Sequence, residues 1–294
     1  MAKVTVYHYD AFSDTPNRGN PAGVVLTADH LKYDEMQHIA HQVGFNETVF
    51  VLKSDKADLK LKYFTPGHEM NLCGHATMAS LYGLKTRGYL EGRETIEIET
   101  KAGILPIVFH TDHEHLTITM KQKTPEFIPF NGDTHKLAAS MGLTEDSLDM
   151  TMPIVYGSTG AWTLLVPIKD LDSFKRMQPN NNAFPDILVE NPKSSLHPFC
   201  LETYHKDALM HARHFSSPYS GTIEDPVTGT ASGVMGAYYL TYIDQEQNDI
   251  QFIVEQGQEI GRDGRVYVHA VRNLEMDIYI SGTAVLIQEF EIEY

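Results

Sequence analysis

Two stretches of this sequence share one pattern at a separation of about half the chain. Glu69-x-x-x-Cys73-Gly74-His75-Ala76 matches Glu224-x-x-x-Thr228-Gly229-Thr230-Ala231, and the offset is constant because 229 − 74 = 224 − 69 = 155. Each copy follows an expected strand and a loop with proline. Each then leads into a run of small apolar residues, which is typical of a buried helix. A repeat with this period predicts two similar domains related by a pseudo-twofold axis.

The two expected helices begin at glycines, Gly74 and Gly229. The first N–H groups of a helix have no partner within the helix, and the helix dipole favours negative charge there. We therefore expect each helix start to bind a carboxylate or phosphate, with the N–H groups of His75 and Thr230 beside those of the glycines. In a duplicated protein the two starts can face one another across a cleft between the domains and form one anion pocket.

The composition indicates a folded protein outside the nucleic-acid-binding and membrane-spanning classes. The 294 residues suffice for two domains, and hydrophobic residues make up 42% of them. A net charge of −16 argues against nucleic acid or an anionic membrane as a partner, and no apolar run reaches the length of a membrane span. The two cysteines, Cys73 and Cys200, and the lack of a secretory signal predict a reducing, cytoplasmic setting without a disulfide.

Four side chains are candidates for chemistry at this pocket: Glu47, His75, Asp225 and Thr230. Glu47 stands at the start of an apolar strand, where a solvated strand end is the more common role of a carboxylate. Shielded from water, the same carboxylate would have a pKa suited to moving a proton on and off carbon. The sequence has no Walker loop, dinucleotide fingerprint, nucleophile elbow or Cys-x-x-Cys pair. Cofactor-free proton chemistry on a small carboxylated substrate is the reaction type that remains.

One histidine-rich segment, His110–His115, contains residue types that bind metals. No second cluster of ligands stands at a recognised zinc spacing, so we interpret this segment as the turn of a hairpin. We expect no metal.

The periodicity of hydrophobic residues and the positions of capping residues, glycine and proline predict most of the secondary structure. We expect a helix over 30–43, capped by Thr27 or Asp29 and ended by Gly44, and a second helix over 133–141. Over 155–166 we expect a glycine-interrupted strand pair or a loop followed by a strand. We also expect a loop over 180–185 and a strand over 199–204.

Four motifs, in order along nearly the whole chain, resemble those of the PhzF-like family of phenazine biosynthesis. They are Gly19-Asn20-Pro21-Ala22-Gly23-Val24, Glu47-Thr48-Val49-Phe50, Phe64-Thr65-Pro66 with Cys73-Gly74-His75-Ala76-Thr77, and Glu224-Asp225-Pro226-Val227-Thr228-Gly229-Thr230-Ala231. The resemblance implies an α+β, diaminopimelate epimerase-like fold: two pseudo-symmetric domains, each a curled, mostly antiparallel sheet around a central helix. It implies domains over 1–123 plus 279–294 and over 124–278, the C-terminal segment returning to the first.

The same resemblance implies a cofactor-independent isomerase that acts on a small carboxylate in the cleft between the domains. It assigns acid/base catalysis to Glu47, with His75 and Asp225 as its catalytic partners. It assigns substrate binding to five further positions: Gly19, Asn20, Gly74, Gly229 and Thr230. The family also suggests a homodimer, without nucleic-acid or membrane partners.

One departure from the wider superfamily affects the mechanism. Diaminopimelate epimerase uses two facing cysteines, whereas this chain has Cys73 at the first position and Thr228 at the second. A hydroxyl cannot replace a thiol as an acid/base for a carbon acid, so racemisation by two thiols is disfavoured and we interpret Cys73 as a packed residue. An amino-acid epimerase or racemase that uses Glu47, and a non-catalytic binding protein on the same fold, remain as alternatives.

Overall fold

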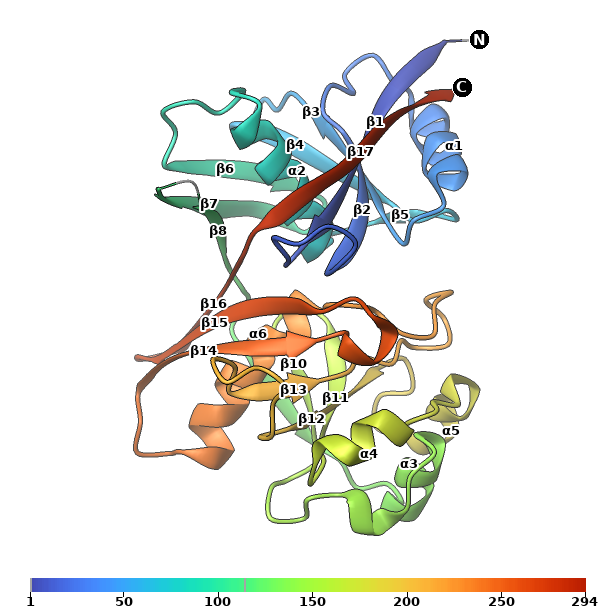
Figure 1. Ribbon diagram of the computed structural model, residues 1–294, viewed down its shortest axis with the longest axis vertical. Helices are drawn as coiled ribbons and strands as arrows, with labels where there is room; N and C mark the ends of the chain where they lie inside the picture. Colours follow the sequence, from blue (N-terminus) through green and yellow to red (C-terminus); the bar gives the residue numbers. More distant parts are fainter. Residues whose placement is uncertain (1, 114) are drawn as a thin grey trace. The chain divides into compact units, whose positions relative to one another are not determined.

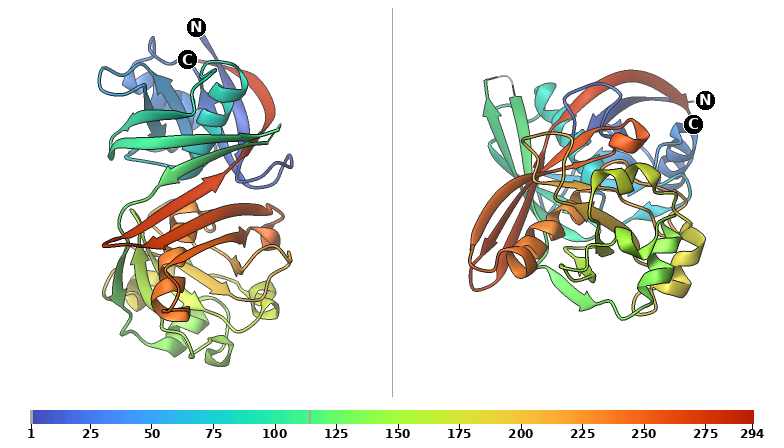
Figure 2. Two further views of the ribbon diagram at one scale, coloured as in Figure 1. Left: turned by 90° about the vertical axis from the view of Figure 1, so that its left-hand side faces the viewer. Right: turned by 60° about the horizontal axis from the view of Figure 1, so that its bottom comes forward.

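The computed structural model describes residues 2–113 and 115–294 and divides into two compact units. The first unit is Met1–Lys121 with Ser281–Tyr294, and the second is Gln122–Ile280. The C-terminal segment therefore returns to the first unit, where the last strand pairs with the first; Figure 2 shows the two chain ends beside one another. Among the described residues, no helix is long and apolar enough to cross a membrane.

In its described residues the first unit contains two helices, and the other regular elements are strands. The helices are α1 (Tyr33–Val43) and α2 (Gly74–Thr86). The strands are β1 (Lys3–Ala11), β2 (Asn20–Val25), β3 (Thr48–Leu52), β4 (Leu59–Phe64), β5 (Glu69–Met70), β6 (Thr95–Thr100), β7 (Gly103–Asp112), β8 (His115–Lys121) and β17 (Ala284–Glu293).

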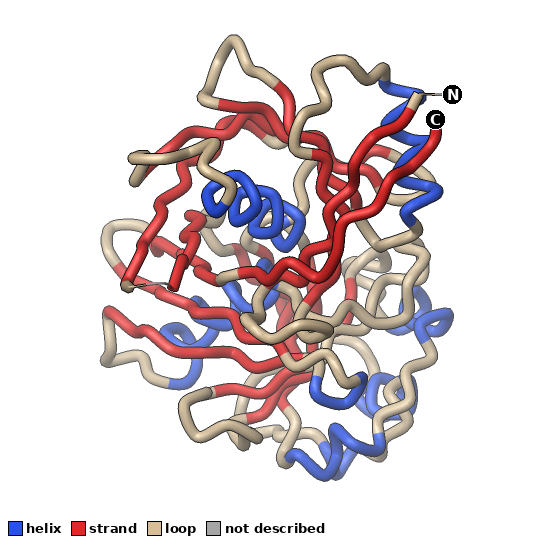
Figure 3. Tube along the Cα trace, turned by 45° about the horizontal axis from the view of Figure 1, so that its top comes forward, coloured by secondary structure: helices blue, strands red, loops and turns tan. Residues whose placement is uncertain are grey.

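The sheet of the first unit curls around α2. Its strands follow the order β17-β1-β2-β3-β4-β6-β7-β8, and α2 contacts strands at both ends of this order, β17 and β8, as well as β1, β2 and β3. Figure 3 shows this helix with strands around it. A helix enclosed in this way must be apolar on every side, and α2 is buried at nine of its positions. The curled sheet around a central helix is confirmed.

The helix α1 lies on β3, β4 and β17 and begins later than the sequence predicted. The expected start at His30 is wrong, because the Asp29 carboxylate accepts a hydrogen bond from the Lys53 N–H at 2.8 Å instead of capping a helix. Glu35 Oε2 accepts the Lys32 N–H at 2.6 Å and so closes the first turn. The predicted end is confirmed: Gly44 has φ 72° and its N–H bonds to the Ala40 carbonyl.

The second unit adds short peripheral helices to the same plan. Its strands are β9 (Glu126–Pro129), β10 (Val155–Ser158), β11 (Trp162–Pro167), β12 (Ser195–Cys200), β13 (Met210–Ala212), β14 (Asp249–Gln256), β15 (Gly264–Arg272) and β16 (Met276–Gly282), whose last residues belong to the first unit. Its α-helices are α3 (Thr134–Ser140), α4 (Leu171–Arg176), α5 (Phe184–Ile187) and α6 (Gly229–Tyr238), and α6 continues into a π-helical turn over Tyr239–Ile243.

The two sheets repeat one sequence of strand directions. From β17 through β1, β2, β3, β4 and β6 to β7, neighbours pair antiparallel, antiparallel, parallel, antiparallel, parallel and antiparallel. From β9 through β10, β11, β12, β13 and β14 to β15 the order of directions is identical (Figure 1). The helix α6 contacts β10, as α2 contacts the corresponding strand β1. At the far end of its sheet α6 contacts β15, which corresponds to β7, whereas α2 contacts the next strand, β8. Each half of the chain is therefore one copy of the same architecture.

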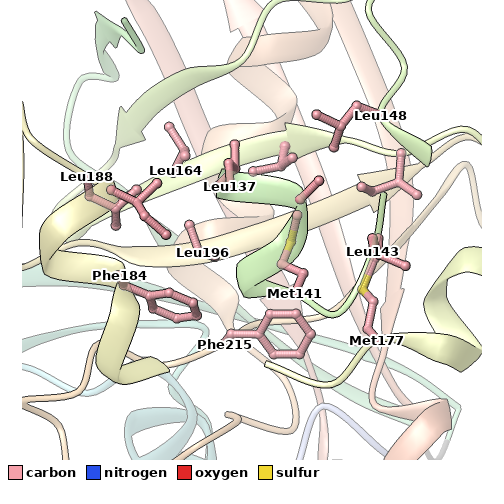
Figure 4. Packing of buried hydrophobic residues seen from close by; sticks show 14 of the residues in the cluster. Leu137, Met141, Leu143, Leu148, Leu164, Met177, Phe184, Leu188, Leu196 and Phe215 are labelled. Atoms are coloured by element: carbon pink, nitrogen blue, oxygen red, sulfur yellow. The ribbon is translucent and has the colours of Figure 1, made fainter. Parts of the chain in front are cut away.

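Two predictions for the second unit are wrong in detail. The expected loop over 180–185 contains a 3₁₀ turn (Asn181–Ala183) and the start of α5, because Phe184 is fully buried and fixes this segment to the core. Figure 4 shows that side chain among leucines of the same apolar cluster. The strand expected over 199–204 is β12, which begins at Ser195 and ends at Cys200. The helix over 133–141 and the strand pair over 155–166 are confirmed.

Candidate active site

The start of α2 carries a buried pair of ionisable groups, Glu47 and His75. The Oε2 atom of Glu47 lies 3.2 Å from Nε2 of His75, and the two side chains are 14% and 8% exposed. Glu47 directly precedes β3, and its carbonyl accepts the N–H of Gly23 at 3.1 Å, which continues the parallel pairing of β2 with β3. Glu47 is therefore not the solvated strand end that its position in the sequence would ordinarily suggest.

Asn20 holds the other side of the His75 ring. Its Nδ2 atom lies 3.2 Å from Nδ1 of His75, and Asn20 is fully buried at the first position of β2. The preceding residue, Gly19, has φ 67°, and a Cβ there would lie 2.2 Å from the carbonyl oxygen of Ala11. Only glycine fits this turn, so the role of Gly19 is to bring Asn20 to the imidazole.

Cys73 completes the group. It is the N-cap of α2, and its Sγ atom lies 3.4 Å from Nδ1 and 3.9 Å from Nε2 of His75. Thr77 Oγ1 donates to the Cys73 carbonyl at 2.7 Å and lies 2.7 Å from the hydroxyl of Tyr63. These contacts fix the cysteine in place. The sequence interpretation of Cys73 as a packed residue omitted its contact with the imidazole.

The electrostatics of the group favour a protonated imidazole. Burial by itself lowers the pKa of His75, but the Cys73 sulfur and the Glu47 carboxylate beside the ring outweigh this effect and raise the pKa well above its usual value. Burial raises the pKa of the Cys73 thiol, and the charge of Glu47 raises it further. The direction of the His75 pKa shift therefore favours a proton on the imidazole.

The N-terminus of α2 offers hydrogen-bond donors at the same place. The first N–H that bonds within the helix is that of Thr77, to the Cys73 carbonyl at 3.0 Å. The N–H groups of Gly74 and His75 precede it and point out of the helix end. No described atom outside the neighbouring residues lies within 4 Å of a Cβ placed on Gly74, so this helix start has open space in front of it.

The second unit places Asp225 in a different network. Thr228, the N-cap of α6, donates its hydroxyl proton to Oδ2 of Asp225 at 2.5 Å. The Gln256 amide joins both residues: Nε2 donates to the Asp225 carbonyl at 2.7 Å, and Oε1 accepts the Thr228 N–H at 3.1 Å. Sequence reasoning missed Gln256, because a single glutamine 28 residues after Thr228, at 256 − 228, follows no motif.

An ion pair holds the residue before Asp225. Arg213 donates from Nε and Nη2 to the two carboxylate oxygens of Glu224 at 2.9 and 2.6 Å, and the side chains are 7% and 10% exposed. The Asp225 N–H bonds to the His214 carbonyl at 3.0 Å. The loop before α6 is therefore fixed to the chain that follows β13. The remaining predicted residues, Gly229 and Thr230, form the first two positions of α6.

The two units differ at equivalent positions. Glu47 directly precedes β3, and the residue directly before β12, the corresponding strand of the second unit, is Ser194. Cys73 and His75 correspond to Thr228 and Thr230 at the 155-residue offset already noted (228 − 73 = 230 − 75). The copy in the first unit therefore holds the carboxylate–imidazole pair, and the copy in the second unit holds hydroxyl groups with Asp225.

Comparisons with known proteins agree with this architecture. The model of a family described as "Phenazine biosynthesis-like protein" matches residues 9–289. "Uncharacterized isomerase YfhB" of Bacillus subtilis is 54% identical over 97% of each chain, and trans-2,3-dihydro-3-hydroxyanthranilate isomerase of Pseudomonas aeruginosa is 29% identical over 89% of this chain and 88% of its own. A crystal structure of a PhzF-family protein from Bacillus anthracis superposes with a TM-score of 0.98, at 54% identity over the whole of both chains.

Proposed function

This chain belongs to the phenazine biosynthesis-like (PhzF) family of isomerases, and we propose that it moves a proton between two carbons of a small carboxylated substrate without a cofactor, with Glu47 as acid and base. The observation that carries this proposal is the buried contact of 3.2 Å between Glu47 and His75. A carboxyl group held out of water against an imidazole, beside the first N–H groups of a helix, suits proton transfer to and from carbon.

The proton transfer balances within the substrate. The Glu47 carboxylate removes a proton from one carbon, the electron pair moves along an adjacent double bond, and the carboxyl group returns the proton to the carbon at the other end. Nothing is consumed. His75 keeps the carboxylate in position, because Asn20 and Cys73 both contact Nδ1 of its ring while Nε2 faces Glu47.

Substrate binding is proposed for the helix starts. The N–H groups of Gly74 and His75 favour a carboxylate. We propose the same role for Gly229 and Thr230 and a partner role in proton handling for Asp225, as the sequence predicted. That both helix starts serve one substrate stays a prediction.

The test is the variant Glu47→Gln, which keeps the size of the side chain and removes its acid/base function. A thermal-shift screen of small cyclic carboxylates, beginning with trans-2,3-dihydro-3-hydroxyanthranilate, supplies the compound to assay. In heavy water, NMR should show a displaced double bond with wild-type protein and a rate lower by roughly 10²–10⁴-fold with Glu47→Gln. Glu69→Gln, a carboxylate paired with Lys101 in the same unit, is the matched control and should keep the rate.

Two results would contradict the proposal. A Glu47→Gln protein with full activity would remove Glu47 from the chemistry. Deuterium at a single carbon with inversion, and no displaced double bond, would show epimerisation instead. A variant of Asp225, Asp225→Asn, tests whether the second unit takes part, because it should lower the rate only if both helix starts serve one substrate.

A further inference from the structure

Three side chains at the start of α2 offer three different metal-ligand atoms. The Glu47 carboxylate, the Cys73 sulfur and the His75 imidazole place one atom each within 4.8 Å of one another. Oxygen, sulfur and nitrogen ligands in this combination are typical of zinc, and a site with three protein ligands leaves the fourth tetrahedral position open.

Two of the three distances between these ligand atoms fit one ion. Zinc binds sulfur at about 2.3 Å and nitrogen or oxygen at about 2.0–2.2 Å, so tetrahedral geometry separates an N–O pair by about 3.4 Å and an S–N pair by about 3.6 Å. From Nε2 of His75, the Glu47 oxygen lies at 3.2 Å and the Cys73 sulfur at 3.9 Å, each within about 0.3 Å of that separation. The third pair, the Glu47 oxygen and the Cys73 sulfur, lies within 4.8 Å.

The residue behind the imidazole supports the same geometry. A histidine that binds metal through Nε2 usually donates its Nδ1–H to a carbonyl or carboxylate. Asn20 lies 3.2 Å from Nδ1 and is fully buried. A half-turn of its amide group presents the carbonyl oxygen instead of the NH₂ group at this position. Asn20 can therefore hold His75 in the tautomer that binds metal.

We propose that Glu47, Cys73 and His75 bind one zinc-class divalent ion. The ion would occupy the Glu47 carboxylate and so inhibit the proton transfer proposed above, on which this part of the inference rests. The Cys73 thiol releases its proton to solvent on binding, and the thiolate and the carboxylate together balance the charge of the ion. Thiolate and imidazole select zinc and cobalt over magnesium and calcium.

Metal binding can be tested without measuring isomerisation, because the experiment detects the bound metal ion directly. Co²⁺ added to the apo protein should bind at one ion per chain and give the near-ultraviolet charge-transfer absorption of a cobalt–thiolate bond. Zn²⁺ should abolish the band, and Mg²⁺ in excess should leave it unchanged.

Cys200 is the matched control for Cys73, since the chain has two cysteines and both are buried. Cys200 lies in β12, its sulfur contacts the Glu202 carbonyl at 3.1 Å, and burial raises its pKa to about 12. The band should survive in Cys200→Ser and disappear in Cys73→Ser. Glu47→Gln gives a second test that keeps the thiol: the band should remain, and Co²⁺ affinity should fall by roughly 10–100-fold, as should that of Asn20→Ala.

Absence of the band in wild-type protein, or its persistence in Cys73→Ser, would overturn the inference. Unchanged Co²⁺ affinity in Glu47→Gln would do the same, and this variant decides the question if Cys73→Ser does not fold. Loss of turnover in Glu47→Gln without any cobalt binding would leave the isomerase proposal standing and remove only the metal site.

Discussion

We expect the side-chain amide of Gln256 to hold the loop before α6, which contains Asp225 and Thr228, in place. The substitution Gln256→Ala removes this amide. Three hydrogen bonds are lost: to the Asp225 carbonyl at 2.7 Å, to the Thr228 N–H at 3.1 Å and to the Thr228 hydroxyl at 3.3 Å. Gln256 is 1% exposed. Each net hydrogen bond contributes about 1 kcal/mol, and a buried group left without a partner costs about 1–3 kcal/mol. We therefore expect a loss of about 3–4 kcal/mol in the free energy of unfolding.

The single tryptophan, Trp162, makes the measurement specific. It lies in β11 of the second unit, the unit that contains Gln256, so its fluorescence reports unfolding of that unit. With a slope of about 1–3 kcal/mol per molar urea, the transition midpoint should fall by about 1–4 M.

Gln251→Ala is the matched control, because Gln251 lies exposed on the same strand, β14. The free energy of unfolding of Gln251→Ala should stay within about 0.5 kcal/mol of that of the wild type. A Gln256→Ala midpoint as close to wild type as that of Gln251→Ala would refute the role given to the Gln256 amide. Gln256→Glu keeps the acceptor for the Thr228 N–H but loses the donor, and so should be destabilised at neutral pH and recover in acid, where its carboxyl group can donate.

Three further predictions concern positions in both units. Gly19→Ala should destabilise the first unit by well over 1 kcal/mol in thermal unfolding, because the strain of a left-handed backbone adds to a clash of the new Cβ with the backbone. Gly44→Ala should cost only about 1 kcal/mol, because Gly44 has φ 72° but no described atom lies within 4 Å of the added Cβ. Arg213→Met should cost about 3–5 kcal/mol in Trp162-monitored unfolding by leaving the Glu224 charge buried, and adding Glu224→Leu should recover most of it. Burial lowers the pKa of His214 to about 4, so as the pH falls this histidine is protonated in the unfolded chain before it is protonated in the folded protein. Stability should therefore fall by up to about 3 kcal/mol from pH 6.5 to 4, and His214→Gln should flatten this loss.

Each of these has a contrary result. Equal losses of stability in Gly19→Ala and Gly44→Ala would show that the backbone clash at Gly19 does not contribute. A variant with both Arg213→Met and Glu224→Leu that is no more stable than Arg213→Met would show that the unpaired Glu224 charge does not cause the loss. An unchanged acid profile in His214→Gln, matching that of the exposed His135→Gln, would place the pH dependence elsewhere. The homodimer suggested by the family also stays a prediction, which sedimentation of the wild-type protein would decide.

The sequence by itself determined several local features of this protein, although it misplaced the start of α1 and the bounds of β12. The repeat located both enclosed helices to the residue, since α2 begins at Gly74 and α6 at Gly229. Helix starts follow from glycine, capping and apolar periodicity, which are properties of neighbouring residues. The four ordered motifs identified the family, and with it the curled sheet around each helix.

Only the tertiary structure decided which side chains meet. Glu47 and His75 are 28 residues apart (75 − 47), and they touch because the parallel pairing of β2 with β3 places the residue before β3 at the start of α2. Cys73 and His75 are only two residues apart, so their contact is local to the start of α2, and the sequence interpretation of Cys73 as a packed residue did not foresee it. Gln256 could not be predicted from the sequence, because its hydrogen bonds to Asp225 and Thr228 join residues that are distant along the chain, and no local sequence pattern indicates such contacts.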